Sequence, residues 1–329
     1  MLDEKDRDAR GLRNQNILYF RNLMKDFRIR RSILNRRDFH DLDHGENASL
    51  RSRFSRLNLK KITAFCREHG VSENVLFLTA YNYCIGIFSG EKDTISTSIH
   101  SGRTDGRWAR LAGPLFLTYI FRCTQVPHET VDHLLKKNGQ QIMDTMRCYV
   151  STLHADEMFF QYQGDILNVD EIGGAPAVRQ KMQLDSLPFH LQVMSDAKGY
   201  YYELRYWENR FDSRQLEIFM DCMERIVEAM LDEPSVRRLK SHLPDTLFPK
   251  HYFIKAETVN RTVGYRLISD VDGDTPVKAY VMDAACRKQP FGGWGSLYIM
   301  DHPTEGWIDK VTNPYGPGTL YQTGITARI

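Results

Sequence analysis

The sequence has little net charge, no long apolar run and no paired cysteines. Its 44 Lys and Arg residues against 42 Asp and Glu give a formal net charge of +2, which argues against a dedicated nucleic-acid-binding protein. No segment approaches the roughly 18 consecutive apolar residues of a membrane helix, and the charged start lacks the apolar run of a signal peptide. The six cysteines are scattered, with no C-x-x-C pair. We therefore expect a soluble, reduced, cytoplasmic protein that binds neither nucleic acid nor a membrane.

Several catalytic motifs are also absent. There is no G-x-x-x-x-G-K-[ST] phosphate loop, no G-x-G-x-x-G after a strand and no G-x-S-x-G elbow. The densest polar group is H-D-L-D-H at 40–44, where His40 and His44 would share a helix face and an aspartate could complete a metal site. That segment lacks an apolar stripe, so we interpret it as a polar loop and expect no metal. Five other histidines have no carboxylate at a suggestive spacing and are interpreted as structural, although any of them could act as a base: His100, His128, His133, His154 and His190.

What the chain does have is a hydrophobic content of 42%, enough for a substantial core, and a length of 329 residues that suits two domains. Residues 1–56 are polar and basic. Seven basic residues lie within seventeen positions of this segment: Arg21, Lys25, Arg28, Arg30, Arg31, Arg36 and Arg37. Such a cluster could bind a phosphate-bearing partner, but a solvated helix face is the favoured interpretation.

From residue 57 to residue 238, helical and strand patterns alternate. Caps and apolar spacing predict, in order, helix 59–69 after Asn58, helix 72–88, strand 95–99, strand 115–121 buried on both faces, a helix from about 127, strand 158–162, hairpin 189–206 and a helix capped by Asp212 with Gln215. After about residue 240, Gly and Pro become frequent and short apolar runs recur at 277–282, 296–300 and 319–323. We expect a linker at 239–276 and a β-rich subdomain at 277–329.

The short sequence stretches of the first part, and their order along the chain, resemble the C-terminal half of a condensation domain of nonribosomal peptide synthetases. The matching stretches are G-V-S-E-N-V-L-F-L-T-A-Y (70–81), S-G-E-K-D-T (89–94), S-I-H-S-G-R (98–103), G-P-L-F-L-T-Y-I-F-R (113–122), F-F-Q-Y-Q (159–163) and Y-W-E-N-R-F-D (206–212). Six stretches in the family's order cover about residues 57–238.

The tail resembles part of an adenylation (AMP-binding) domain of the same synthetases. The stretches are A-Y-V-M-D (279–283), P-F-G-G-W-G-S-L-Y-I (290–299) and T-N-P-Y-G-P-G-T-L-Y-Q-T-G (312–324), followed by Ala327 and Arg328. A condensation lobe followed by adenylation sequence is the domain order of those synthetases.

The resemblance implies an α/β fold: one chloramphenicol-acetyltransferase-like lobe, half of a condensation domain, plus a small β-rich adenylation-type subdomain. It implies a substrate-tunnel or structural role for seven residues: Ser101, Gly102, Arg103, Gly113, Phe116, Thr118 and Arg122. It also implies a vestigial nucleotide-binding set: Tyr321, Thr323, Gly324 and Arg328. The parent reaction joins two acyl groups tethered to carrier proteins, and the parent system uses phosphopantetheine and ATP with magnesium.

Departures from the family pattern set the functional alternatives. The family's catalytic H-H-x-x-x-D-G belongs to a first lobe that this sequence lacks, the phosphate loop and catalytic lysine of adenylation are missing, and Ile325 replaces the ribose-binding aspartate. We therefore expect no cofactor bound by this chain and no activity unless a complementing lobe acts in trans. The alternatives are a non-catalytic module that docks a carrier protein or a neighbouring synthetase subunit, and a decayed gene product. The apolar surface of a half-domain would also favour self-association.

Overall fold

The computed structural model describes residues 12–27, 45–101, 116–126, 128–148, 158–165, 171–172, 175–176, 187–248, 252–259, 262–267, 277–290, 292–301 and 307–328. These residues belong to two compact units, and the main division between them falls between His242 and Leu243. None of the helices in these ranges is long and apolar enough to cross a membrane.

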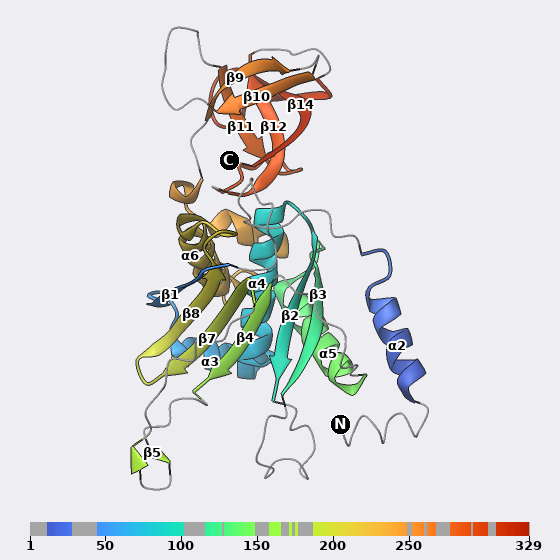
Figure 1. Cartoon of the computed structure of the whole chain (residues 1–329), viewed down its shortest axis with the longest axis vertical. Helices are drawn as coiled ribbons and strands as arrows, with labels where there is room; N and C mark the ends of the chain where they lie inside the picture. The colour runs from blue at the N-terminus through green and yellow to red at the C-terminus, as the bar shows by residue number, and fades with distance from the viewer. Residues whose placement is uncertain are drawn as a thin grey trace. The chain divides into compact units, whose positions relative to one another are not determined.

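The first unit is a mixed sheet with helices (Figure 1). Its elements are α2 (Leu12–Leu23), β1 (Asn47–Arg53), α3 (Leu59–His69), α4 (Glu73–Ser89), β2 (Asp93–His100), β3 (Leu117–Thr124), α5 (Val131–Arg147), β4 (Phe159–Gly164), the short pair β5 (Glu171–Ile172) and β6 (Ala175–Pro176), β7 (Phe189–Asp196), β8 (Gly199–Trp207), α6 (Ser213–Met230) and the 3₁₀ helix η1 (Val236–His242). The sheet order is β1-β8-β7-β4-β2-β3. Strand β4 runs parallel to β2 and β7, and the other neighbours are antiparallel.

The capping residues confirm several sequence predictions. The Asn58 side chain accepts a hydrogen bond from the Lys61 amide at the start of α3, and Gly70 ends that helix with a left-handed φ of 65°. Asp212 accepts from the Gln215 amide at the start of α6. The helix expected from about residue 127 begins at Val131 instead, because the Thr130 side chain caps it.

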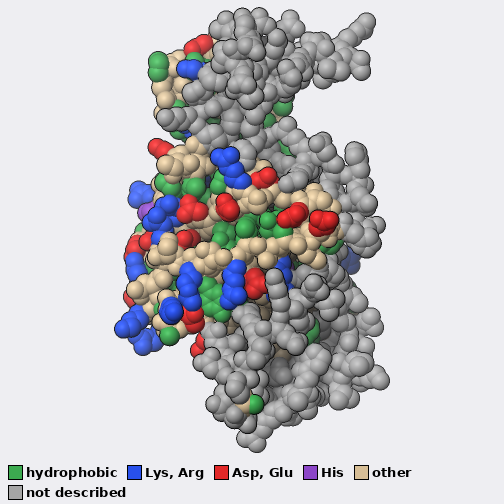
Figure 2. Space-filling model, turned by 60° about the vertical axis from the view of Figure 1, so that its left-hand side comes forward, with side chains coloured by type: hydrophobic (Ala, Val, Ile, Leu, Met, Phe, Trp, Pro, Cys, Tyr) green, Lys and Arg blue, Asp and Glu red, His purple; other side chains and the backbone are tan. Residues whose placement is uncertain are grey.

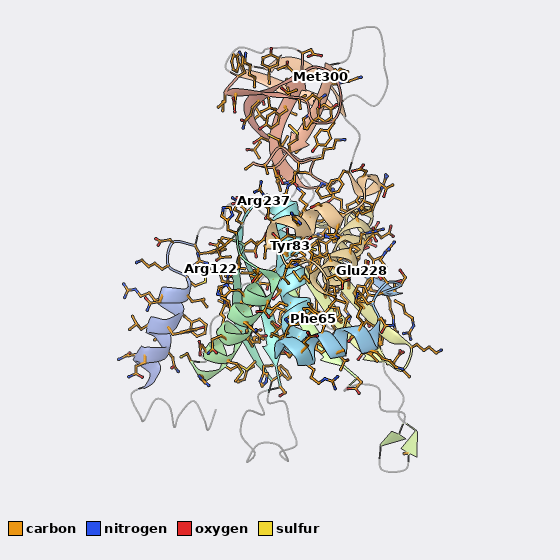
Figure 3. All side chains as sticks on the ribbon, turned by 180° about the vertical axis from the view of Figure 1, so that it is seen from behind. Phe65, Tyr83, Arg122, Glu228, Arg237 and Met300 are labelled. Carbon is orange, nitrogen blue, oxygen red and sulfur yellow. The ribbon has the colours of Figure 1, made fainter. Side chains whose placement is uncertain are left out.

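Helices α3 to α6 cover one face of the sheet, as the view from behind shows (Figure 3). Aromatic rings join the two layers: Tyr81 of α4 packs against Phe160 of β4 and Phe189 of β7, and Phe219 of α6 packs edge-on against Tyr81. These four side chains are almost fully buried and contribute to the hydrophobic stabilisation of the unit.

The strand predicted at 115–121 lies at 117–124 and forms an edge of the sheet. It was expected to be buried on both faces, and this holds only for its centre: Tyr119 and Phe121 on the helix-covered face and Ile120 on the opposite face are buried, whereas Thr118 and Arg122 are only half-buried. The strand is therefore covered on both sides at its middle and partly open towards its ends.

The second unit is an antiparallel sheet in the order β10-β9-β11-β12-β14-β13. It comprises the 3₁₀ helix η2 (Asp245–Leu247), β9 (Tyr252–Val259), β10 (Thr262–Leu267), β11 (Val277–Met282), β12 (Trp294–Met300), β13 (Asp309–Thr312) and β14 (Thr319–Arg328). The runs at 277–282, 296–300 and 319–323 are strands, as expected. The segment 239–276, expected as a linker, differs: β9 and β10 form a hairpin, and β9 pairs with β11. Residues 1–56, expected as a polar segment, contain α2 and β1.

Candidate functional site

The six-stranded sheet has one face that points away from α3–α6, and we call it the distal face. Contacts fix which side chains belong to it. Thr94 and Ser96 of β2 bond to Asn82 of α4, and Cys123 of β3 contacts Asn138 of α5. Because successive strand residues point to opposite faces, their neighbours point to the distal face.

Strand register places two rows of side chains across the centre of this face. One row runs from Thr97 through Phe159 and His190 to Arg205, and the next runs from Gln161 through Gln192 to Glu203. The residues come from β2, β4, β7 and β8, so no short stretch of sequence contains them. The centre of the distal face is therefore a polar band flanked by Phe159 and Thr97.

Three side chains of this band are joined by hydrogen bonds. Gln192 Nε2 donates to Gln161 Oε1 at 3.0 Å, and His190 Nε2 lies 3.3 Å from the same oxygen. The His190 ring also meets the Phe159 ring edge-on, with centroids 4.8 Å apart. His190 and Gln192 are 7% and 8% exposed. Their bonds satisfy polar groups that would otherwise be costly to bury.

Charged side chains lie next to Gln161, His190 and Gln192, on the side of the sheet towards β1. Arg205 Nε pairs with Glu203 Oε1 at 3.0 Å. The guanidinium of Arg53 lies 5.3 Å from the centre of the Tyr201 ring and bonds to Asp196, and this bond lowers the pKa of Asp196 below its usual value. Basic side chains, with acidic ones among them, are visible on this side of the unit (Figure 2).

The expected tunnel residues are placed only in part. Gly102, Arg103 and Gly113 lie outside the described residues. Ser101 is exposed just after β2, and Phe116 is 60% exposed just before β3. Thr118 pairs with Ile99 in the β2–β3 register and lies on the distal face, away from the His190 row.

Arg122, the last of that set, has structural partners. Its guanidinium donates two hydrogen bonds to Asp93, at 2.8 and 2.5 Å, and further bonds to the backbone oxygens of Leu23 and Lys25. It also lies 5.4 Å from the centre of the Phe27 ring. The hydrogen bond to Asp93 raises the pKa of Arg122. Arg122 thus fastens the end of α2 to the edge of the sheet (Figure 3).

In the second unit, the residues of the expected nucleotide-binding set make contacts within the sheet. Thr323 Oγ1 donates to the Leu297 backbone oxygen at 3.0 Å, and the Tyr321 ring packs edge-on against Trp307. Gly324 has a φ of 75°, and a side chain there would come 2.9 Å from Ile308 Cδ1. The backbone of Arg328 pairs with Trp294.

Ile325 packs against a buried apolar cluster of the second unit. That cluster consists of Ala279, Val281, Leu297 and Ile299. The position that was expected, from the resemblance alone, to correspond to a ribose-binding aspartate is thus part of an apolar contact here, and isoleucine offers no side-chain hydrogen bond.

No group of three or more His, Cys, Asp and Glu that could hold a metal occurs within the described ranges. The segment 40–44 lies outside them, and so does His154. Among the other histidines, His133 is bonded to Glu129 on the surface of α5, and burial lowers the pKa of His100. His190 alone among the described candidates lies in the polar band.

Sequence reasoning missed the polar band. It named His190 but gave it no partner, and it used Gln161 only as part of a family-like strand. The alternation of F-H-L-Q-V in β7 was the available signal, because a polar residue at every second position marks one face of a strand.

Comparison with known proteins identifies the fold of the first unit. No family model matches the sequence, and no curated protein matches it. Solved structures do. A four-domain nonribosomal peptide synthetase bound to AMP and glycine is similar over 68% of this chain and 20% of its own, with a TM-score of 0.56 and 12% identity.

Two other similar structures are single domains. The epimerization domain from the third module of tyrocidine synthetase B is 12% identical, with a TM-score of 0.53 over 68% of this chain and 56% of its own. The condensation domain of the monacolin K polyketide synthase is 13% identical, with a TM-score of 0.53 over 70% of this chain and 60% of its own. The chain thus spans a fifth to six tenths of these proteins, and the first unit has a condensation-domain-like fold.

Proposed function

We propose that the first unit is a condensation-type lobe that binds an acyl thioester carried by the phosphopantetheine arm of a carrier protein. The parent reaction is attack of an amine on that thioester to form an amide. The observation that carries the proposal is the condensation-domain-like fold of a sheet whose distal face has a central polar band, Gln161, His190 and Gln192.

The chemistry of the band suits such a substrate. Each of the two side-chain amides, and the imidazole, can donate and accept hydrogen bonds. The amide groups of the phosphopantetheine arm need a donor and an acceptor in turn. Phe159 and Ile120 add apolar surface on the same face. A mixed lining of this kind is typical of sites that hold an elongated, partly polar ligand.

A complementing lobe would pack beside the centre of the distal face, where His190 and Gln192 are already buried. The larger exposed apolar side chains of the described residues lie outside the strands of the first sheet: Ile17, Leu18, Phe116, Val126, Met143, Trp307, Ile308 and Tyr315. Pairing through the distal face would therefore rest on polar contacts as well as burial. Self-association through an apolar face stays a prediction.

The second unit is proposed to be an adenylation-type β subdomain that does not bind ATP. The contacts of Thr323 and Ile325 within its sheet support this part of the proposal.

A non-catalytic docking module is the second candidate, and the contacts of Arg122 favour it. If this residue holds α2 and does not line a tunnel, part of the family-like sequence serves structure alone. The unit would then bind a carrier protein or a synthetase subunit without turnover.

Binding to a carrier protein tests the proposal. We expect the full chain to bind a carrier with a stable amide analogue of an aminoacyl-phosphopantetheine arm at least tenfold more tightly than the same carrier without its arm, a difference of about 1.4 kcal/mol. Isothermal titration calorimetry measures both affinities.

The carrier without its arm is the matched control, because it presents the same protein surface. Equal affinities for the two carriers would contradict thioester-arm recognition and would leave docking through the protein surface as the function.

A further inference from the structure

Strand β1 is the outermost strand of the first sheet, and β8 is its one neighbouring strand among the described residues (Figure 1). At one end of this pairing the Phe54 amide donates to the Tyr200 backbone oxygen at 3.1 Å. At the other end the Glu208 amide donates to the Glu46 backbone oxygen at 3.0 Å. Because alternate residue pairs of an antiparallel ladder exchange such bonds, the even-numbered residues of β1 bond to β8. The odd-numbered residues turn their backbone N–H and C=O groups away from it.

This outer edge of β1 is suited to pairing with a further strand. The backbone groups of Ser49, Arg51 and Arg53 face outward along it. The register with β8 continues without a shift over all seven residues of β1, and none of them is a proline. Proteins commonly protect an edge strand with a bulge or a proline. Neither feature protects β1.

The same odd-numbered residues bring positive charge to the distal face. The guanidinium groups of Arg51 and Arg53 lie 5.6 and 5.3 Å from the centre of the buried Tyr201 ring, and both arginines are exposed. The register partner of Arg51 is Glu203, whose carboxylate is paired with Arg205. Within the part of the chain that the structure describes, Arg51 thus has an aromatic contact but no carboxylate partner.

The charge of the edge selects its occupant. Asp196 neutralises Arg53, but the exposed side chains of Arg51 and Arg56 add positive charge beside it. A second copy of β1 would bring two more arginines to the same face, and like charges on neighbouring strands destabilise a sheet. A strand with Glu or Asp at alternate positions would instead place its carboxylates next to Arg51 and Arg53.

We propose that β1 is the docking edge for an extended acidic segment of a partner protein, which adds a strand to the first sheet. Backbone hydrogen bonds to the outward groups of Ser49 and Arg51 provide affinity, and ion pairs with Arg51 and Arg53 provide specificity. This site lies at the edge of the sheet and uses no residue of the polar band. It is therefore independent of thioester binding.

A synthetic peptide tests the proposal directly. The probe is acetyl-T-E-V-E-T-E-V-amide, which as a strand has all its glutamates on one face. We expect it to bind the full chain with a dissociation constant below about 1 mM in isothermal titration calorimetry. The control peptide has the same sequence with N-methyl groups on its three central residues. It keeps the charge but loses the amide donors, and it should bind at least tenfold more weakly.

Two pairs of variants separate backbone pairing from charge. Ser49→Pro removes an outward N–H, a position that an edge strand tolerates, and should weaken peptide binding at least tenfold, about 1.4 kcal/mol. Ser49→Ala keeps the amide and should stay within twofold. Arg51→Glu should also weaken binding at least tenfold. Arg67→Glu makes the same charge change on the exposed side of α3 and should stay within twofold.

The contrary results are equally specific. Absence of binding, equal binding of the two peptides, or full binding by both Ser49→Pro and Arg51→Glu overturns the proposal. A dimer in sedimentation velocity that Ser49→Pro abolishes also overturns it, because the edge would then hold a second copy. Circular dichroism shows whether each variant is folded. If Ser49→Pro does not fold, the N-methylated peptide and Arg51→Glu decide the question.

Discussion

Replacing Glu73 by Ala should destabilise the first unit by about 1.5–3 kcal/mol. Glu73 is the first residue of α4, and its carboxylate accepts hydrogen bonds from Thr63 Oγ1 at 2.8 Å and from the Tyr162 hydroxyl. These bonds connect α3, α4 and β4. The variant would remove the charged acceptor of the half-buried Tyr162 hydroxyl, and a hydrogen bond to a charged acceptor contributes more than one between neutral groups.

The tyrosines near Glu73 stay protonated, so they remain donors at neutral pH. Burial, and next the hydrogen bond to Glu73, raise the pKa of Tyr162 well above its usual value. Burial and the same carboxylate also raise the pKa of Tyr200. The arrangement thus depends on the carboxylate acceptor and not on a charge on either ring.

Denaturant unfolding of the full chain measures the effect. Glu68→Ala, on the exposed side of α3, is the matched control and should change stability by less than about 0.5 kcal/mol. Tyr162→Phe should cost about 1–2 kcal/mol and should have little further effect in the Glu73→Ala background. Equal stabilities of the Glu73 and Glu68 variants would show that the hydrogen bonds contribute nothing.

Replacing Arg122 by Leu should cost about 2–3 kcal/mol and loosen α2. The substitution removes both bonds to Asp93 and the two bonds to the carbonyl oxygens of Leu23 and Lys25. Arg122→Lys should retain part of the charge interaction but lose the paired geometry, because an ammonium group cannot match a carboxylate at two points. Arg122→Lys should therefore lower the stability of the first unit, but by less than Arg122→Leu does.

Amide hydrogen exchange detects the local effect on α2. Peptides of residues 12–23 should exchange at least tenfold faster in Arg122→Leu. Arg225→Leu is the control, since Arg225 bonds to Asp221 on its own helix, and such pairs contribute about 0.3–0.5 kcal/mol. Unchanged exchange in α2 would contradict the role of Arg122 as its fastening.

Local signals allowed much of the first unit to be predicted. Helices α3 and α6 have side-chain caps and apolar stripes within a single stretch of sequence, and β7 and β8 alternate on either side of a tight turn. In each case the information lies within about twenty residues. The condensation-like order of these elements could therefore be recognised from the sequence.

Elements that depend on distant partners could not be predicted. Strand β1 has the sequence N-A-S-L-R-S-R, which lacks an apolar run, and it forms because β8 offers an edge to pair with. The same holds for Arg122, whose partner Asp93 is 29 residues away and whose partner Leu23 is 99 residues away. Contacts over such sequence separations produce no signal in the local hydrophobic pattern.

The candidate site was hidden for the same reason. Gln161 and His190 are 29 residues apart in sequence and meet only because β4 and β7 are parallel neighbours in a defined register. A one-residue shift of either strand would turn its side chain to the helix-covered face. Sequence could name His190 as a candidate but could not supply its partner.

The most direct test of thioester binding at the distal face is amide hydrogen exchange of the full chain with the carrier protein. The carrier would bear either the stable aminoacyl-phosphopantetheine analogue or no arm. We predict that the arm slows exchange specifically in β4, β7 and β8, the strands that hold Gln161, His190 and Glu203. Protection confined to strands β11–β14, or the same protection with both carriers, would contradict binding at this face.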